Sequence, residues 1–520
     1  MDNIRILWAD DEIDLLKPQL KFLEKRDYDV TTVTNGHDAL EEIEEAETGF
    51  DVVFLDESMP GLTGLETLSK IKEQQPLLPV VMITKNEAEN VMEEAIGAQI
   101  SDYLIKPVNP NQILLTLKKI VDHKRLVREK TNSDYQQEFR SLMMEMSGPL
   151  DVAQWADIYS RLINWEIKID DSNATQMGEI LSMQKSEANT GFSKFVEKNY
   201  LDWINDAEGA PTMSHNLLRK KVFPKLDKEV PSVLLVLDNL RYDQWRAIEP
   251  LISERFRVEE EDFFYSILPT STQYSRNAIF AGMMPSEIAK HYRSLWKNDN
   301  EEGGKNNHEA ELLESQINRL FRKPIKHSYT KITNVKNARH LQDNILNYLH
   351  NDLTVIVYNF IDMLSHARTE MEVLKELAGD EKAYRSLTRS WFENSLVWTS
   401  LQRAADQQEI QLIITTDHGT IRVNSPSRVV GDRETTTNLR YKVGRNLKYE
   451  ERDVLAVRDP EKAKLPRPNV SSTFIFAKED KFFLYPNNYN HYHNYYKNTF
   501  QHGGISLEEV ICPIVRLRSK

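Results

Sequence analysis

The sequence predicts an α/β protein of several domains, with a doubly wound domain, a helical bundle and a second α/β domain in chain order. Three observations support this prediction. Apolar runs alternate with amphipathic stretches over residues 1–120, helical apolar spacing without strand-like runs fills residues 141–210, and apolar runs that end in aspartate begin at Val233. Continuous apolar strands alternating with helices are typical of buried parallel sheets. We place the domains at residues 1–122, 123–210 and 211–520.

The first domain contains five apolar runs that predict five parallel strands. These are Ile4–Ala9, Asp29–Val33, Val52–Leu55, Val80–Ile83 and Tyr103–Ile105. Helical periods lie between them, as in Leu15–Glu24 and Gly64–Gln74. In flavodoxin-like sheets of this kind, ligands bind at the carboxyl ends of the strands.

The rest of the chain gives a coarser prediction. Residues 110–140 lack glycine and are highly charged beyond Leu117, which indicates one helix that continues from the first domain into a connector. The polar stretches 298–308 and 425–450 are expected to be loops. Three apolar runs predict strands of the last domain: Val233–Asp238, Leu353–Asp362 and Ile410–Asp417.

Composition narrows the class of protein. The chain has 520 residues and a net charge of −14, so it is a poor candidate for binding duplex DNA through a basic surface. It could still hydrolyse a nucleotide, because bound metal ions can reverse the sign of the local electrostatic field. Cys512 is the only cysteine, so we expect neither a disulfide framework nor a thiolate zinc site. The N-terminus does not resemble a signal peptide, and no run approaches ~18 apolar residues, so we expect a cytoplasmic protein without membrane insertion.

Acidic and hydroxyl side chains follow the predicted strands of the first domain. Asp10 and Asp11 follow the first strand and Asp56 ends the third. These ends converge in a parallel sheet, and a divalent cation, best Mg²⁺, would relieve the repulsion between the carboxylates. Asp56 can then act as a nucleophile that forms an aspartyl phosphate. Thr84 can hydrogen-bond the phosphoryl oxygens, and Lys106, whose bond to the next proline can be cis, can pair with the acids.

The motifs ADDE, FLDESMPGLTG, MITK and YLIKP cover this segment and resemble the receiver domain of two-component response regulators. The resemblance implies a Mg²⁺ site at Asp10, Asp11 and Asp56, and phosphorylation of Asp56. It also implies that Thr84 and Tyr103 form the switch pair. A plain aromatic packed at the sheet edge is the alternative interpretation of Tyr103.

A second set of acids and histidines follows the strands of the last domain. Its members are Asp238, Asp362, His366, Asp417, His418 and His502. The aspartates end the three apolar runs, and His366 lies one helical turn after Asp362, on the same helix face. Oxygen and nitrogen ligands of this kind suit zinc, or less clearly manganese. Two such ions ~3.5–4 Å apart assist in-line displacement in many hydrolases. The set therefore predicts a two-metal hydrolase.

The stretch LPTSTQYSRNAIFAG supplies candidates for the nucleophile of such a hydrolase. Thr270, Ser271 and Thr272 precede an apolar helical stretch, and the N-terminus of a helix favours an anionic phosphate. Metal coordination would lower the pKa of the hydroxyl. Two purely structural interpretations stay open, in which Thr272 or Asp238 is only the N-cap of a helix.

Several motifs of this region resemble the alkaline phosphatase superfamily. D-x-x-x-H, D-H-G, H-G-G and P-T-x-T look like its phosphodiesterase-type members, and LDNLRYDQW, LPTSTQYSRNAIFAGMMP and QHGGISLEEVICP look like its PglZ type. The resemblance implies an alkaline-phosphatase-like α/β domain with Thr272 as nucleophile. Arg241 either binds substrate phosphate or forms a salt bridge. The resemblance implies two zinc sites, one of Asp238, Thr272, Asp417 and His418, the other of Asp362, His366 and His502.

The domain order resembles the PglZ-domain response regulators of type IX secretion in Bacteroidetes, over essentially the whole chain. This implies a sensor histidine kinase, a homodimer formed on phosphorylation, and contacts with a sigma factor or a secretion-system component. The implied activity is a phosphodiesterase for nucleotides or for cyclic or linear oligonucleotides. No basic helix pair follows the first domain, so direct promoter binding has no support. A zinc-binding scaffold that acts by protein contact and a phosphomonoesterase are the alternatives.

Overall fold

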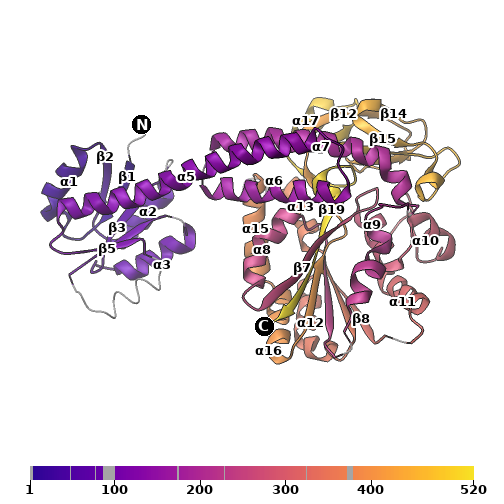
Figure 1. Cartoon of the computed structure of the whole chain (residues 1–520), viewed down its shortest axis with the longest axis horizontal. Helices are drawn as coiled ribbons and strands as arrows, with labels where there is room; N and C mark the ends of the chain where they lie inside the picture. Colours follow the sequence, from indigo (N-terminus) through magenta and orange to yellow (C-terminus); the bar gives the residue numbers. More distant parts are fainter. Residues whose placement is uncertain are drawn as a thin grey trace. The chain divides into compact units, whose positions relative to one another are not determined.

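The structure is a computed structural model that divides into two compact units, residues 1–134 and 135–520 (Figure 1). Helix α5 (Pro110–Met146) begins in the first unit and ends in the second, as the charged stretch predicted. Among the helices that the structure describes, none has a segment long and apolar enough to cross a membrane. The described residues are 4–46, 49–76, 78–85, 100–172, 175–205, 207–227, 229–323, 325–371 and 379–520.

The first unit is built on a five-stranded parallel sheet with the order β2-β1-β3-β4-β5. This is the flavodoxin-like doubly wound order that the sequence predicted. The strands are β1 (Ile4–Ala9), β2 (Tyr28–Val33), β3 (Val52–Asp56), β4 (Val80–Thr84) and β5 (Asp102–Ile105). The helical elements besides α5 among the described residues of this unit are η1 (Ile13–Leu16), α1 (Lys17–Glu24), α2 (Gly36–Glu45) and α3 (Gly64–Gln74).

The start of α3 shows how local sequence shapes the carboxyl edge of this sheet. Thr63 and Glu66 form a capping box in which each side chain accepts a hydrogen bond from the other residue's backbone N–H. A Cβ at Gly64 would lie 2.4 Å from the carbonyl oxygen of Asp56. Glycine at this position therefore lets α3 pack directly against the end of the strand that carries Asp56.

The second unit begins with a helical hairpin whose two helices lie side by side (Figure 1). Its helices are α6 (Val152–Ser172) and α7 (Thr175–Trp203). Gly191 of α7 allows close approach, since a Cβ there would lie 2.9 Å from the ring of Trp155. Phe192 and Trp203 contact Tyr265 of the following sheet, with ring centroids 6.1 and 5.7 Å apart. The predicted helices are present, and they share one hydrophobic core with that sheet.

A six-stranded sheet with the order β7-β19-β10-β6-β9-β8 forms the centre of the second unit. Strands β10, β6, β9 and β8 are parallel, and β19 runs antiparallel to both β10 and β7. The three predicted strands are the adjacent β10, β6 and β9. The bounds are β6 (Ser232–Leu237), β7 (Phe256–Tyr265), β8 (His327–Ile332), β9 (Leu353–Tyr358), β10 (Gln411–Thr415) and β19 (Ile511–Ser519).

Helices surround this sheet and the smaller sheets beyond it, and some of them carry parts of the site. Those that the structure describes are α8 (Tyr242–Ile252), α9 (Thr272–Ala281), α10 (Pro285–His291), α11 (Glu309–Leu320), α12 (Val335–Tyr348), α13 (Phe360–Glu370), α15 (Glu381–Glu393), α16 (Leu396–Gln407), α17 (Tyr489–Tyr496) and α18 (Leu507–Val510). The short helical turns are η2 (Ser214–Asn216), η3 (Leu218–Val222), η4 (Phe223–Lys225), η5 (Glu451–Asp453) and η6 (Pro460–Ala463).

Small sheets occupy the region between β10 and β19. Here and at the end of β9, two predictions from the sequence were wrong. Residues 425–450 are not simply loops, because three strands lie within them. Strand β9 stops at Tyr358, and Asp362 lies in the first turn of α13 rather than at the end of a strand. The small strands are β11 (Ile421–Arg422), β12 (Ser425–Val430), β13 (Tyr441–Gly444), β14 (Lys448–Tyr449), β15 (Val454–Val457), β16 (Thr473–Ala477), β17 (Lys481–Leu484) and β18 (Phe500–Gln501).

Candidate metal centres and nucleophile

The carboxyl edge of the first sheet brings Asp10, Asp11 and Asp56 together. One oxygen of each lies within 4.8 Å of the others. The Nζ atom of Lys106 lies 3.0 Å from Asp10 Oδ2 and 2.9 Å from Asp56 Oδ1, and the peptide bond from Lys106 to the next proline is cis. Burial raises the pKa of Asp56. A cluster of three carboxylates with one lysine fits a hard divalent cation with oxygen ligands.

The two residues predicted as the switch pair lie on neighbouring strands. The hydroxyl of Thr84, at the end of β4, donates a hydrogen bond to the carboxylate of Glu57. The side chain of Tyr103, on β5, is exposed. Thr84 is thus engaged by an acid next to Asp56, whereas the ring of Tyr103 faces outward.

The six acids and histidines of the second unit form two groups, and in each group the ligand atoms lie within 4.8 Å of one another. The rings of His418 and His502 stack with centroids 4.3 Å apart, so the two groups are neighbours. Each group holds the acids and histidines that the resemblance to the alkaline phosphatase superfamily assigned to one metal site. The groups are Asp238, Asp417 and His418, here the inner cluster, and Asp362, His366 and His502, here the outer cluster.

The inner cluster is fully buried and holds the candidate nucleophile. Asp238 directly follows β6, and Asp417 and His418 follow β10. The hydroxyl of Thr272 lies 3.1 Å from Nε2 of His418 and 3.3 Å from Oδ1 of Asp238. Thr272 is the first residue of α9, and Ser271 occupies the N-cap position without a side-chain cap. The hydroxyl therefore faces the inner cluster instead of capping its own helix.

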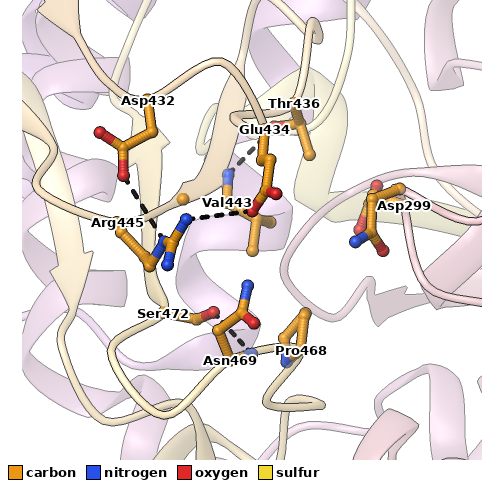
Figure 2. Close-up of a pocket in the computed structure, with 11 residues that line it drawn as sticks. Asp299, Asp432, Glu434, Thr436, Val443, Arg445, Pro468, Asn469 and Ser472 are labelled. Carbon is orange, nitrogen blue, oxygen red and sulfur yellow. Dashed lines mark hydrogen bonds and ion pairs between the residues drawn. The ribbon is translucent and has the colours of Figure 1, made fainter.

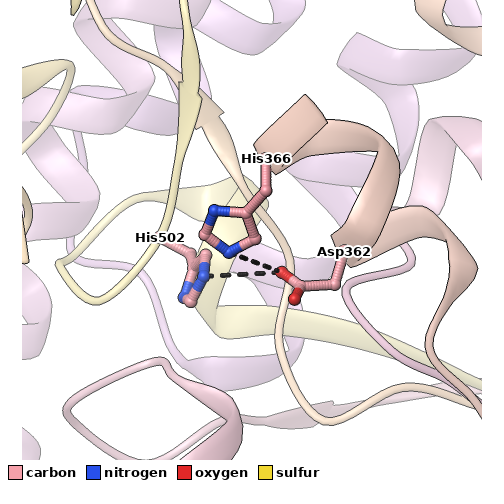
Figure 3. A group of neighbouring side chains, drawn as sticks. All are labelled: Asp362, His366 and His502. Atoms are coloured by element: carbon pink, nitrogen blue, oxygen red, sulfur yellow. Dashed lines mark ion pairs between the residues drawn. The ribbon is translucent and has the colours of Figure 1, made fainter. Parts of the chain in front are cut away.

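The three side chains of the outer cluster point toward one another (Figure 3), and none of them is fully buried. The Nε2 atoms of His366 and His502 each lie 3.6 Å from Oδ1 of Asp362. The side chain of His366 is 63% exposed, whereas that of His502 is 12% exposed. His366 thus occupies the side from which a ligand can approach.

The electrostatics of both clusters suit divalent metal ions. Burial lowers the pKa of His418 to about 4 and that of His502 to about 4, so both imidazoles are neutral and keep a free lone pair. Burial, reinforced by the charge of Asp238, raises the pKa of Asp417, and burial raises the pKa of Asp362 as well. Oδ2 of Asp417 is buried without a hydrogen bond. One guanidinium, that of Arg276, lies 2.7 Å from Asp238 and 3.8 Å from Asp417, so a single cation serves two buried carboxylates and a divalent metal ion would supply the remaining positive charge.

Hydrogen bonds to and from the backbone fix the orientation of these ligand side chains. Nδ1 of His418 lies 3.1 Å from the carbonyl oxygen of Gly419 and must donate to it, which leaves Nε2 for a metal. Asn239 has a left-handed backbone with φ of 69°. Its backbone N–H donates to Asp417, and its side-chain amide donates to Asp362. Asn239 therefore links the inner cluster to the outer one, a role that the sequence analysis missed.

Arg276 is a second residue that the sequence analysis missed. It lies one helical turn after Thr272 on α9, and that i, i+4 spacing was the available signal. Its buried guanidinium lies 2.7 Å from Asp238 and 2.6 Å from Glu309. Burial opposes ionisation of Asp238, but the adjacent guanidinium holds the pKa of that carboxyl below its usual value. Arg276 thus keeps one ligand of the inner cluster charged.

Arg241 lies in the salt bridge that was one of its two interpretations. Its side chain is 2% exposed, with nitrogen atoms 2.6 Å from Asp243 and 2.5 Å from Glu381. The guanidinium also lies over the ring of Phe500, 4.9 Å from its centroid. These contacts engage the side chain within the protein, so the geometry does not favour the substrate-binding interpretation.

A pocket away from these residues is too small to hold a nucleotide (Figure 2). It is lined in part by Asp432, Glu434 and Arg445, and Arg445 pairs with both acids at 3.5 and 3.2 Å. Its cavity is about 20 Å³, room for roughly one water molecule. Arg445 therefore neutralises Asp432 and Glu434 within the protein.

The two sites define a protein in which a flavodoxin-like sheet with a carboxylate cluster is joined to an α/β domain with two candidate metal centres. Residues 6–118 match the response regulator receiver domain, residues 125–204 the PorX response regulator linker domain, and residues 217–517 the BREX system PglZ alkaline phosphatase-like domain. The last match covers more than half of the chain, and the chain belongs to the PglZ family. Its receiver, PorX-type linker and PglZ domain give it a PorX-like architecture. The presence of a receiver domain implies a cognate sensor histidine kinase as a partner.

The similar proteins named below each match about a quarter of this chain. The transcriptional regulatory protein ZraR of Escherichia coli O157:H7 is 33% identical over 130 residues, 25% of this chain and 29% of ZraR. ResD of Bacillus subtilis is 30% identical over 120 residues, 23% of this chain and 49% of ResD. A solved CheY-like receiver from Methanospirillum hungatei is 28% identical and covers 23% of this chain and 94% of its own, with a TM-score of 0.22. The matches thus span less than half of these curated relatives.

Proposed function

We propose that this protein is a response regulator, phosphorylated on Asp56, whose effector is a dinuclear zinc phosphodiesterase. The substrates would be nucleotide-type diesters, including cyclic or linear oligonucleotides, and the process would be type IX secretion. One observation carries the proposal: the hydroxyl of Thr272 lies within hydrogen-bonding distance of both Asp238 and His418. A hydroxyl among buried metal-type ligands is the arrangement that an activated nucleophile needs.

The residues present suggest how the reaction would run. Asp238, Thr272, Asp417 and His418 would hold one zinc ion, and Asp362, His366 and His502 the other. When bound, the two ions would lower the pKa of the hydroxyl and stabilise charge on the phosphoryl oxygens. Thr272 would lose its proton to solvent and attack phosphorus, the P–O bond to the leaving group would break in line, and the departing oxygen would take a proton from water to give the free alcohol. Water would then release the phosphothreonine and restore the hydroxyl, while the N–H groups at the start of α9 favour the anion.

The receiver would supply the regulation. Asp10, Asp11 and Asp56 would bind Mg²⁺, and Lys106 would contact the phosphoryl group on Asp56 together with Thr84. Phosphorylation would change the face around Thr84 and Tyr103 and favour a homodimer. A sigma factor or a secretion-system component would be the downstream partner.

Two other functions use the same residues. A zinc-binding scaffold would keep both metals and act by protein contact alone. A phosphomonoesterase would need positive groups for a third phosphate oxygen, and both Arg241 and Arg276 are already engaged by two carboxylates each. That engagement favours a diester, which carries one charge less.

The test compares two substrates on the full-length protein with bound zinc counted in parallel. We expect two zinc ions per chain and faster turnover of bis(p-nitrophenyl) phosphate than of p-nitrophenyl phosphate. The reverse order of rates would support the monoesterase. Two bound zinc ions without turnover of either ester would support the scaffold.

A further inference from the structure

Among the described residues of helix α7, in the PorX-type linker segment, four polar side chains are strongly buried. Gln184 hydrogen-bonds to Tyr135 and Phe139 of α5, and the other three, Asn189, Ser193 and Tyr200, are 5%, 1% and 2% exposed. Burying a polar group costs free energy unless the group is hydrogen-bonded. The partners of these three side chains therefore indicate what the buried face of α7 holds in place.

Two of the three side chains hold the segment that follows His502. The backbone N–H of Leu507 donates to Oδ1 of Asn189 at 2.8 Å, and the amide of Asn189 donates to Glu508 at 3.1 Å. The hydroxyl of Ser193 donates to the carbonyl oxygen of Ile505 at 3.4 Å. Residues three to six positions after this outer-cluster histidine are thus tied to α7.

The third side chain holds the segment that precedes the candidate nucleophile. The backbone N–H of Leu268 donates to the hydroxyl of Tyr200 at 2.8 Å. Leu268 lies four residues before Thr272, at the start of the turn that leads into α9. One face of one helix therefore contacts both segments that meet at the two clusters.

The two segments are also joined to each other. The hydroxyl of Thr270 donates to the carbonyl oxygen of Gly504 at 2.9 Å, and the N–H of Gly503 donates to Thr270 Oγ1 at 3.0 Å. A shift of α7 relative to either segment would consequently move Thr272 relative to His502. A misplacement of about 1 Å can lower an enzyme's rate by about a hundredfold.

We infer that α7 is a positioning element of the catalytic centre, with Tyr200 setting the nucleophile segment and Asn189 setting the His502 segment. The inference rests on the proposed phosphoesterase function. Neither residue contacts a metal ligand or Thr272 through a hydrogen bond given by the structure, so both act through backbone. The linker helix is then part of the active site's support, and it is a route by which a change in the linker reaches the chemistry.

The first test removes a single hydroxyl. Tyr200→Phe keeps the ring in the core and leaves the N–H of Leu268 without its acceptor. We expect kcat for bis(p-nitrophenyl) phosphate to fall about tenfold or more, with KM within about twofold, because positioning acts on the reacting atoms. Tyr159→Phe on α6 is the matched control, since its hydroxyl is buried and has no hydrogen-bond partner among the described residues. Equal kcat in the two variants would overturn the role of Tyr200.

The second test does not depend on turnover. Asn189→Leu should weaken binding of the zinc ion at the outer cluster by about tenfold, and the milder Ser193→Ala should weaken it less. Titration of zinc into the full-length apoprotein measures both affinities. Unchanged affinity for both zinc ions in the two variants would overturn the role of Asn189. If the wild type hydrolyses no ester, the proposed function fails and this titration alone decides the inference.

Discussion

The carbonyl oxygen of Thr270 lies 3.1 Å from Nδ1 of His502. A carbonyl can only accept a hydrogen bond, so Nδ1 carries the proton and Nε2 keeps its lone pair toward Asp362. The turn that leads into Thr272 therefore also orients a ligand of the outer cluster. Nucleophile and outer cluster are built on one connected piece of backbone.

Removing the hydroxyl of Thr270 should loosen this connection. In Thr270→Val the N–H of Gly503 loses its acceptor, which we expect to cost about 1–3 kcal/mol of unfolding free energy. Zinc affinity of the outer cluster should fall roughly tenfold, because residues that orient ligands commonly contribute that much. Urea unfolding and zinc titration measure the two effects. Thr420→Val is the control, since that hydroxyl is buried without a partner among the described residues; identical behaviour of the two variants would contradict the account.

The ion pair between Arg276 and Glu309 should be strongly coupled. Arg276→Met leaves Glu309 and Asp238 buried with less counter-charge, so the free energy of unfolding should fall by about 3–5 kcal/mol. The double variant Arg276→Met/Glu309→Met should lose less than the sum of the single variants, because it removes both charges of one pair. Urea unfolding of the metal-free protein measures this. Additive losses would show that the two side chains act independently.

The acid stability of the second unit should depend on Glu166 of α6. Its carboxylate accepts hydrogen bonds from Lys185 at 2.6 Å and from Arg385 at 2.7 Å. Burial opposes its ionisation, but these two cations lower its pKa to about 2 from 4.5. Above pH 4.5 the carboxylate is charged in both the folded and unfolded states, and its full contribution to stability is present. Between pH 4.5 and 2 the unfolded chain takes up a proton first, so stability falls.

The variant Glu166→Gln tests this pH dependence. It should be less stable than the wild type at pH 7, and the difference between their unfolding free energies should shrink as the pH falls from 4.5 to 2. Urea unfolding at a series of pH values measures the difference. A difference that stays constant through this range would contradict the assignment.

Phosphorylation should require Asp56. Wild-type protein with Mg²⁺ and acetyl phosphate should gain one phosphoryl group by intact mass, and Asp56→Asn should gain none. Asp29→Asn, at an exposed acid of the same sheet, should behave as the wild type. Phosphorylation of Asp56→Asn to the wild-type level would place the acceptor elsewhere.

Two of the three strand ends that carry acids of the second unit were predictable from the sequence, whereas the end of β9 and the residues that connect the two clusters were not. Asp238 and Asp417 follow continuous apolar runs, so their convergence follows from the parallel sheet alone. Strands β7 and β8 escaped prediction because both lie at edges of the sheet and carry many polar residues, and the apolar run of β19 is interrupted by Pro513. Asn239 and Thr270 act through contacts with residues more than 100 positions away, which no local pattern encodes.

The most direct test of the central claim is the turnover of bis(p-nitrophenyl) phosphate by Thr272→Val, with bound zinc counted in the same sample. The account predicts that both zinc ions remain and that turnover falls by at least about a thousandfold, as for loss of a catalytic nucleophile. Turnover at the wild-type rate by Thr272→Val with both zinc ions bound would contradict it.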